Sequence, residues 1–289
     1  EKNVFDTCSY LYKFIKEKDC NTIITHGNGP QVGNVLLQHE AGQNVFGVPK
    51  MPIDFCVAET QGSIAYLIEQ QLYNNFKINN TKKNIVSIIT QVFVDKNDAA
   101  FQNPTKPVGP FYSKEEADKL IQQNNWKFKE DPRQRGWRRV VPSPKPIDIN
   151  NAQIIKKLAD EGNIVVAVGG GGIPVYFDDD NKIIGIDAVI DKDLASALLA
   201  NKVNADYFYI LTDVPNVCIN FHKPNEKKLH KVSASEIKKY LEEGHFAEGS
   251  MAPKIRAALN FIANGGKQTI ITQAKYLTDS EAGTIITAD

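Results

Sequence analysis

The stretch IVVAVGGGG, residues 164–172, decides the fold of this chain. Five apolar and mostly β-branched residues are typical of a strand buried on both faces, and the glycines mark its end. Four consecutive glycines cost on the order of 1 kcal/mol each relative to alanine at ordinary positions, more than a plain turn warrants. A flexible linker is the alternative, but Ile173–Val175 follows the loop immediately. We therefore predict that Gly169, Gly170, Gly171 and Gly172 bind a ligand that approaches the backbone closely.

Two further stretches follow β-branched runs in the same way, Thr25–Pro30 and Ile190–Asp193. A strand that ends in glycines and opens a helix exposes backbone N–H groups where anions bind without a side chain. We predict a phosphate site at Gly27, Asn28 and Gly29; the alternative is a tight turn whose glycines serve only backbone geometry. A dinucleotide fingerprint would need glycine at position 32, which is Val32, and the Walker A pattern is absent.

Short β-rich runs alternate with helical patterns along most of the chain. Pro30 and Pro253 each open a helical pattern, and Gly162 closes another. Apolar strands that alternate with helices predict a three-layer α/β/α sandwich around a mostly parallel central sheet. The expected strands are Thr22–Thr25, Ile85–Thr90, Ile164–Val168, Tyr207–Leu211 and Thr269–Thr272.

Residues 95–147 break this rhythm. They are rich in proline, contain both tryptophans and include a helix with the capping-box pattern Ser113 to Glu116. Such an excursion within an α/β unit indicates a protruding lid subdomain inserted into a single domain of residues 1–289. The acidic run Asp178–Asn181 is interpreted as a hairpin turn, since no other ligand stands at metal-binding spacing.

Composition limits the function. The 34 basic and 34 acidic residues of the 289-residue chain cancel, which argues against a nucleic acid partner. The four cysteines (Cys8, Cys20, Cys56 and Cys218) have no pairing or metal-binding spacing and are predicted to be reduced thiols. No apolar run is long enough to span a membrane, so the expected location is the cytoplasm, with no membrane partner.

Three lysines lie at positions where their positive charge could be used to bind a phosphate. Lys192 and Lys254 each lie in the first turn of a predicted helix, where the helix dipole disfavours a cation. Lys106 lies in a stiff, proline-rich segment. Asp193 is expected to cap the helix that follows Lys192. A solvated surface is the alternative for any one lysine, but their recurrence at helix starts favours an enzyme that transfers a phosphoryl group.

Taken together, these segments resemble the carbamate kinase family of the amino-acid-kinase fold. The resemblance runs across nearly the whole chain. It is carried by Thr25–Gly33, Gln102–Tyr112, Arg135–Pro146, Val168–Pro174, Asp187–Leu194, Leu211–Val214 and Gly244–Lys254.

This resemblance implies reversible phosphoryl transfer between ATP and carbamate, often run from carbamoyl phosphate and ADP in fermentative arginine breakdown, with Mg²⁺ and a homodimer. It implies catalytic roles for Lys106, Lys192, Lys254 and Asp191, the aspartate holding the lysine ammonium groups. Gly27–Gly29 would embrace the acceptor, and Gly169–Gly172 the donor phosphates and carbamate. Thr212, Asp213, Met251 and Pro253 would lie along the nucleotide, although Thr212 and Asp213 by themselves fit a turn cap equally well. No residue is predicted to bind a metal directly.

The resemblance also implies a first strand that ends in a Gly-Gly-Asn loop. The sequence instead begins with a helical stripe from Val4 to Ile15, so this segment is expected upstream of Glu1. Two alternatives to carbamate kinase remain open from the residues. One is a kinase of the same fold that acts on an amino acid carboxylate or a nucleotide, and the other is a non-catalytic nucleotide-binding homologue.

Overall fold

Strand β8 (Ile164–Val166) forms the centre of the computed structural model, which describes residues 2–131 and 134–289. It pairs in parallel with β1 (Thr22–Ile24) on one side and β2 (Ile85–Ser87) on the other. All three β8 residues are buried, as the apolar stretch predicts. The predicted strand is two residues too long, because Ala167 and Val168 already lead into the glycine turn.

Helices cover both faces of this sheet. Ile164 and Val166 pack into a core with α1 (Lys2–Lys18) and α3 (Ile53–Ile78). Val165, pointing to the opposite face, packs with α5 (Ala152–Asp160) and α6 (Lys192–Lys202). Alternate residues of one strand therefore contact two different helical layers, which confirms the predicted three-layer arrangement.

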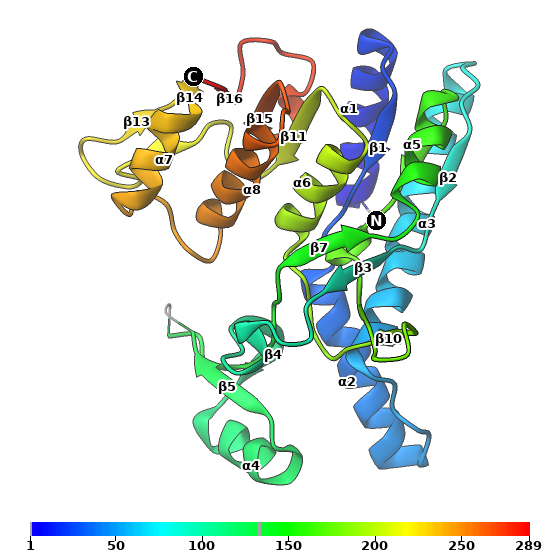
Figure 1. Ribbon diagram of the computed structural model, residues 1–289, viewed down its shortest axis with the longest axis vertical. Helices are drawn as coiled ribbons and strands as arrows, with labels where there is room; N and C mark the ends of the chain where they lie inside the picture. Colours follow the sequence, from blue (N-terminus) through cyan, green and yellow to red (C-terminus); the bar gives the residue numbers. More distant parts are fainter. Residues whose placement is uncertain (1, 132–133) are drawn as a thin grey trace.

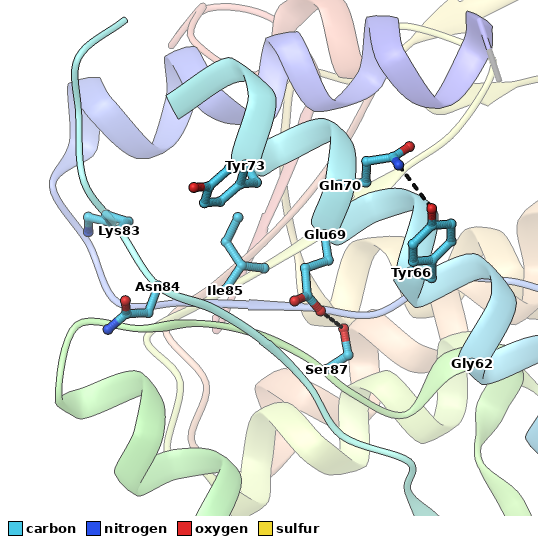
Figure 2. A pocket seen from close by; sticks show the side chains of 9 residues that line it. All are labelled: Gly62, Tyr66, Glu69, Gln70, Tyr73, Lys83, Asn84, Ile85 and Ser87. Atoms are coloured by element: carbon cyan, nitrogen blue, oxygen red, sulfur yellow. Dashed lines mark hydrogen bonds between the residues drawn. The ribbon is translucent and has the colours of Figure 1, made fainter. Parts of the chain in front are cut away.

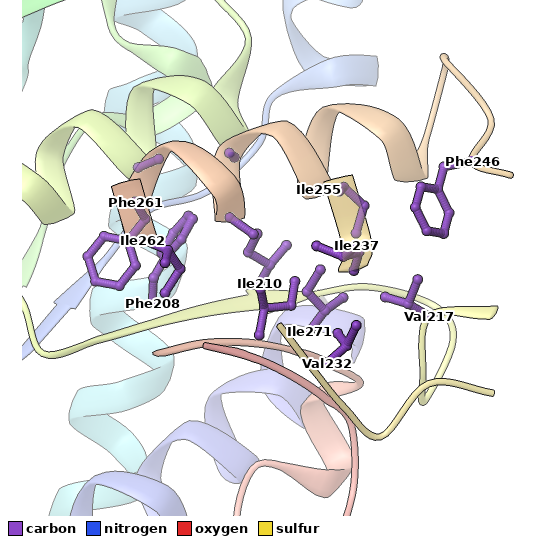
Figure 3. Close-up of a cluster of buried hydrophobic side chains, with 14 of the residues drawn as sticks. Phe208, Ile210, Val217, Val232, Ile237, Phe246, Ile255, Phe261, Ile262 and Ile271 are labelled. Atoms are coloured by element: carbon purple, nitrogen blue, oxygen red, sulfur yellow. The ribbon is translucent and has the colours of Figure 1, made fainter. Parts of the chain in front are cut away.

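The C-terminal half repeats this plan with a second sheet in the order β11-β15-β16-β14. Its core lies under α8 (Met251–Ala263) and α7 (Ala234–Glu242) and includes the fully buried Phe261 (Figure 3). Strand β11 is parallel to β15, so their carboxyl ends meet at one edge. The strands are β11 (Tyr207–Leu211), β14 (Lys231–Ser233), β15 (Gln268–Thr272) and β16 (Thr284–Thr287).

A third sheet has the strand order β10-β9-β3-β7. Asp178 closes the β9–β10 hairpin, because its carboxylate accepts from the amides of Asp180 and Lys182 at 2.9 and 2.8 Å. The acidic run is thus the predicted turn. The strands are β3 (Gln91–Val94), β7 (Pro146–Ile149), β9 (Ile173–Phe177) and β10 (Ile183–Gly185).

The segment predicted as a subdomain holds a three-stranded antiparallel sheet, β4-β6-β5, and helix α4, which stand away from the other layers (Figure 1). Ser113 and Glu116 form the predicted capping box at the start of α4. The expected boundary at 147 falls inside β7, which belongs to the main body. The elements are η1 (Ala99–Phe101), β4 (Lys106–Tyr112), α4 (Lys114–Asn124), β5 (Lys127–Glu130) and β6 (Trp137–Val141).

Helix α2 (Gly29–Phe46) follows the first glycine loop directly, and η2 (Gly169–Gly171) forms the second. All four cysteines are free thiols. Burial raises the pKa of Cys8 and of Cys56 to about 11, which keeps both thiols protonated and unreactive. The remaining short elements are β12 (Cys218–Ile219), β13 (Lys227–Lys228) and η3 (Ala274–Tyr276).

Candidate active site

The start of α6 brings together the three predicted lysines. Asp191 is the N-cap of this helix, and one of its oxygens accepts from the amides of Asp193 and Leu194 at 3.0 and 3.3 Å. Its other oxygen accepts from Lys106 Nζ at 2.9 Å. Burial would raise the pKa of Asp191, but Lys106 and the two amides outweigh it and hold the pKa below its usual value. Asp191 therefore both caps α6 and binds Lys106, which comes from the subdomain.

Asp193 joins the other two lysines. Its Oδ1 accepts from Lys192 Nζ at 2.6 Å and its Oδ2 from Lys254 Nζ at 2.9 Å. The prediction that Asp193 caps α6 is wrong. Asp191 has the extended backbone of a cap, whereas Asp193 already lies within the helix and its side chain reaches the lysines. The spacing Asp-Lys-Asp supplies two carboxylates that both suit a cap, and the backbone conformation decides that the first caps α6 and the second pairs with lysines.

The cluster carries an excess of positive charge. Three lysines against two carboxylates leave a formal charge of +1 (3 − 2). Lys254 has a side chain only 13% exposed, and burial lowers its pKa, with Asp193 opposing the shift and Lys192 adding to it. A partly buried group of this charge is suited to receive an anion.

The lowered pKa of Lys254 predicts the alkaline limit of activity. The lysine is charged below its folded-state pKa and neutral above it, so turnover that needs its charge falls as pH rises through that pKa, at a lower pH than an ordinary lysine would set. Arginine stays protonated throughout this range, so Lys254→Arg will move the alkaline limb of the kcat profile to higher pH. The exposed Lys238→Arg serves as the control. An unmoved limb in Lys254→Arg would contradict the assignment.

The two glycine loops lie side by side next to this cluster. The amide of Gly170 donates to the His26 carbonyl at 2.7 Å, and a Cβ on Gly27 would lie 2.9 Å from Cδ of Lys192. His26 has a lowered pKa because of its burial, opposed by its contact with the Gly27 carbonyl, so the ring is neutral between the loops. Sequence reasoning gave His26 no role.

The second glycine loop differs from its prediction in one respect. The amides of Gly170, Gly171 and Gly172 donate to the carbonyls of His26, Val168 and Gly169, so the expectation of exposed amides is wrong for these three. Close packing explains the glycines instead. A Cβ on Gly170 would lie 2.3 Å from the Asn28 side chain, and one on Gly171 would lie 2.4 Å from a backbone carbonyl. Both have positive φ. A phosphate-binding role for this loop stays a prediction.

The first glycine loop leaves a helix start uncapped. Asn28 is buried, and its Nδ2 donates to Thr60 Oγ1 at 3.0 Å while its side chain makes no cap on α2. Gly29 is exposed, with no heavy atom within 4 Å of an added Cβ. Helix α8 likewise has an N-cap, Ser250, whose side chain makes no capping bond. Neither helix start has a side-chain cap, but in α8 the amides of Met251 and Ala252 both donate to the Ala247 carbonyl at 3.1 Å.

The predicted nucleotide residues lie at the adjoining sheet edge. The amide of Thr212 donates to the Thr272 carbonyl at 2.9 Å, and Gln273 Nε2 donates to the carbonyl of Asp213. Met251 begins α8, so Pro253 is its third residue rather than its first. These contacts do not join Thr212 or Asp213 to the three lysines, and the role of both residues stays a prediction.

Two features bear on ligands. The described residues contain no group of three His, Cys, Asp or Glu side chains that could hold a metal ion. A cavity of about 500 Å³ shares no residue with the lysine cluster and lies between α3 and the residues around β2 (Figure 2). In the part of the chain that is described, no helix is both long and apolar enough to cross a bilayer.

Comparisons with known proteins agree with this geometry. Residues 3–273 match the model of the amino acid kinase family. The carbamate kinase of Thermococcus kodakarensis is 50% identical over 282 residues, 98% of this chain and 89% of that protein. The carbamate kinase of Trichomonas vaginalis is 49% identical over 265 residues, 91% of this chain and 83% of that protein. The structure of carbamate kinase from Giardia lamblia bound to AMP-PNP is 46% identical and aligns with a TM-score of 0.91 over 100% of this chain and 91% of that chain.

Proposed function

Because this chain belongs to the amino acid kinase family and, within it, to the carbamate kinases, we propose that it transfers a phosphoryl group reversibly between ATP and carbamate. In the direction that yields ATP, it would use carbamoyl phosphate and ADP, as in fermentative arginine breakdown. One observation carries the proposal. Lys106, Lys192 and Lys254, from three separate elements, converge on two aspartates at the start of one helix beside two glycine loops.

The proposed chemistry needs charge and position rather than a protein nucleophile. A carbamate oxygen attacks the γ-phosphorus of ATP in line, the bond to the β,γ-bridging oxygen breaks, and ADP leaves with that electron pair. The lysine ammonium groups neutralise the charge on the transferring phosphoryl oxygens. Asp191 and Asp193 hold the three ammonium groups in place before substrate binds, so little reorganisation is needed in the transition state.

The substrates are proposed to bind near the N-termini of α2 and α8. Gly27 and Gly29, at the uncapped start of α2, would bind the acceptor side, and Asn28 fixes that loop through Thr60. Thr212, Asp213, Met251 and Pro253 would lie along the nucleotide, near the start of α8. The positive end of a helix dipole favours phosphate oxygens.

Magnesium is proposed to enter with the nucleotide. Mg²⁺ retains several waters and is commonly held by one or two carboxylates and substrate phosphates. The described residues offer no three-ligand cluster, which fits a cation carried mainly by ATP or ADP. Such a cation would share the neutralisation of phosphate charge with the lysines.

A coupled assay for ATP tests the proposal. The purified protein is incubated with carbamoyl phosphate, ADP and Mg²⁺, with acetyl phosphate as an alternative phosphoryl donor. We expect ATP from carbamoyl phosphate in preference to acetyl phosphate. ATP formed only from another acyl phosphate would favour a kinase with a different acceptor. Nucleotide binding without any turnover would favour the non-catalytic homologue and contradict the proposal.

We also propose a homodimer that forms through one face of α3. Phe55, Tyr66 and Tyr73 are 54%, 61% and 57% exposed and recur at spacings of 11 and 7 residues, which places them on the same side of the helix. Gly62 lies between them, and the groove beside this face is the large cavity (Figure 2). Sedimentation equilibrium tests the proposal, and a monomer at every concentration would contradict it.

A reducing, cytoplasmic location, supported by the four free thiols, completes the proposed function.

A further inference from the structure

Helix α2 meets the protruding subdomain through a backbone contact at Gly33 and Gly109. A Cβ on Gly33 would lie 2.5 Å from both Cα and N of Gly109, well inside the 3.5–4.0 Å of an ordinary carbon contact. The obstructing atoms are backbone, so a methyl group on Gly33 could be accommodated only if α2 and β4 moved apart. The backbones of α2 and β4 are therefore in direct contact at this point.

A second contact lies two helical turns further along the same face of α2. Glu40 Oε1 pairs with Arg139 Nη1 of β6 at 3.6 Å, and the side chains are only 21% and 17% exposed. The Arg139 guanidinium also lies 3.9 Å from the centre of the Trp126 ring. Burial lowers the pKa of Arg139 and raises that of Glu40, and each charge opposes the shift of the other. The pair thus joins α2 to the subdomain at a second point, away from the glycine contact.

The strand that contacts α2, β4, also carries Lys106. Strand β4 begins with Lys106, and its next inward residue, Val108, is 2% exposed and pairs with Arg139 across β6. Gly109 is held from its other side as well, because Arg138 Nε and Nη2 both donate to its carbonyl at 3.1 and 2.9 Å. A shift of β4 at Gly109 would therefore be passed directly to Lys106, three residues away.

We propose that Gly33 and Glu40 are positioning residues for phosphoryl transfer. They hold the subdomain against α2 and thereby place Lys106 Nζ beside Asp191, in the same cluster as Lys192 and Lys254. Helix α2 also begins in the first glycine loop, so one rigid element sets both the loop and the distance to Lys106. This inference rests on the proposed phosphoryl transfer.

Gly33→Ala tests the inference most directly. A misplacement of about 1 Å in a catalytic group can cost up to a hundredfold in rate, and we expect kcat to fall about tenfold or more with KM for ADP changed less than about twofold. Both tryptophans of the chain lie in the subdomain, so intrinsic tryptophan emission will report its displacement. Gly42→Ala is the matched control. It lies in the same helix, and its nearest heavy atom would be 4.0 Å from the new methyl group.

Glu40→Gln provides a second variant that introduces no steric clash. It removes the ion-pair partner of Arg139, and we expect a lower kcat, an unchanged KM for ADP and altered Trp126 emission. Glu59→Gln, which removes an exposed carboxylate paired with His39, is its control. If the parent protein forms ATP and Glu40→Gln and a folded Gly33→Ala retain full kcat, the inference is overturned. If Gly33→Ala does not fold, Glu40→Gln decides alone. A parent protein that forms no ATP would instead refute the proposed function.

Discussion

Replacing Lys192 or Lys254 with alanine will lower kcat by roughly a hundredfold or more in each case, as expected for loss of a preorganised charge that acts on a transition state. Both ammonium groups are bound to Asp193, so their positions do not depend on substrate. Removing one also leaves Asp193 with a single partner, and its negative charge then faces the phosphoryl group. The loss will appear mainly in kcat, measured by formation of ATP from carbamoyl phosphate and ADP.

The matched control for these variants is Lys238→Ala. Lys238 is 65% exposed and pairs with Glu242 at 3.9 Å on α7, so it loses an ion pair of the same chemical kind away from the cluster. Pairs of this type contribute little, and we expect full activity. Thermal unfolding of each variant separates a catalytic loss from a folding defect. Full turnover in either Lys192→Ala or Lys254→Ala, with the protein folded, would exclude that lysine from catalysis.

Phe261→Ala will have the largest effect on stability, a loss of roughly 3–5 kcal/mol in the free energy of unfolding. Phe261 is fully buried in α8, contacts the Phe208 ring at a centroid distance of 5.6 Å and lies against Gly266 (Figure 3). Because α8 also carries Lys254, the cavity would loosen the helix that presents this lysine. The loss is a large share of the 5–15 kcal/mol typical of a folded domain.

Urea-induced unfolding measures this change. Ile154→Ala is the control, since Ile154 is 52% exposed on α5 and its truncation leaves no internal cavity. We expect the control to change the free energy of unfolding by no more than about 0.5 kcal/mol. A Phe261→Ala variant as stable as the parent would mean that the core under α8 can collapse around the missing ring.

The strands and caps were predictable because their causes are local. The buried run at Ile164–Val166, the capping box at Ser113 and the acidic turn at Asp178 each depend on residues within a few positions of one another. The helix that follows Ile190 was also expected, but its cap was assigned to the wrong aspartate. Asp191 and Asp193 are both suitable cap residues, and only the backbone conformation distinguishes them.

Other features escaped prediction where distant segments pack together. The amides of Gly170 and Gly171 were expected to be exposed, but both donate to backbone carbonyls, and Asn28 and the Ile190 carbonyl occupy the space where side chains would be. The close approach of Gly33 to Gly109 had no signal in the sequence, since a single glycine in a helical pattern is common. Neither contact could be inferred from periodicity or composition.

By itself, the sequence determined the order of strands and helices, the burial of β8 on both faces and the three lysines suited to phosphate, because periodicity and helix-end chemistry act over short distances. Tertiary structure alone decided which carboxylate holds Lys106 and which holds Lys254. Lys106 meets Asp191 across 85 positions and Lys254 meets Asp193 across 61. Ion pairs over such separations form only after the sheets and helices have packed, because no local preference brings their side chains together.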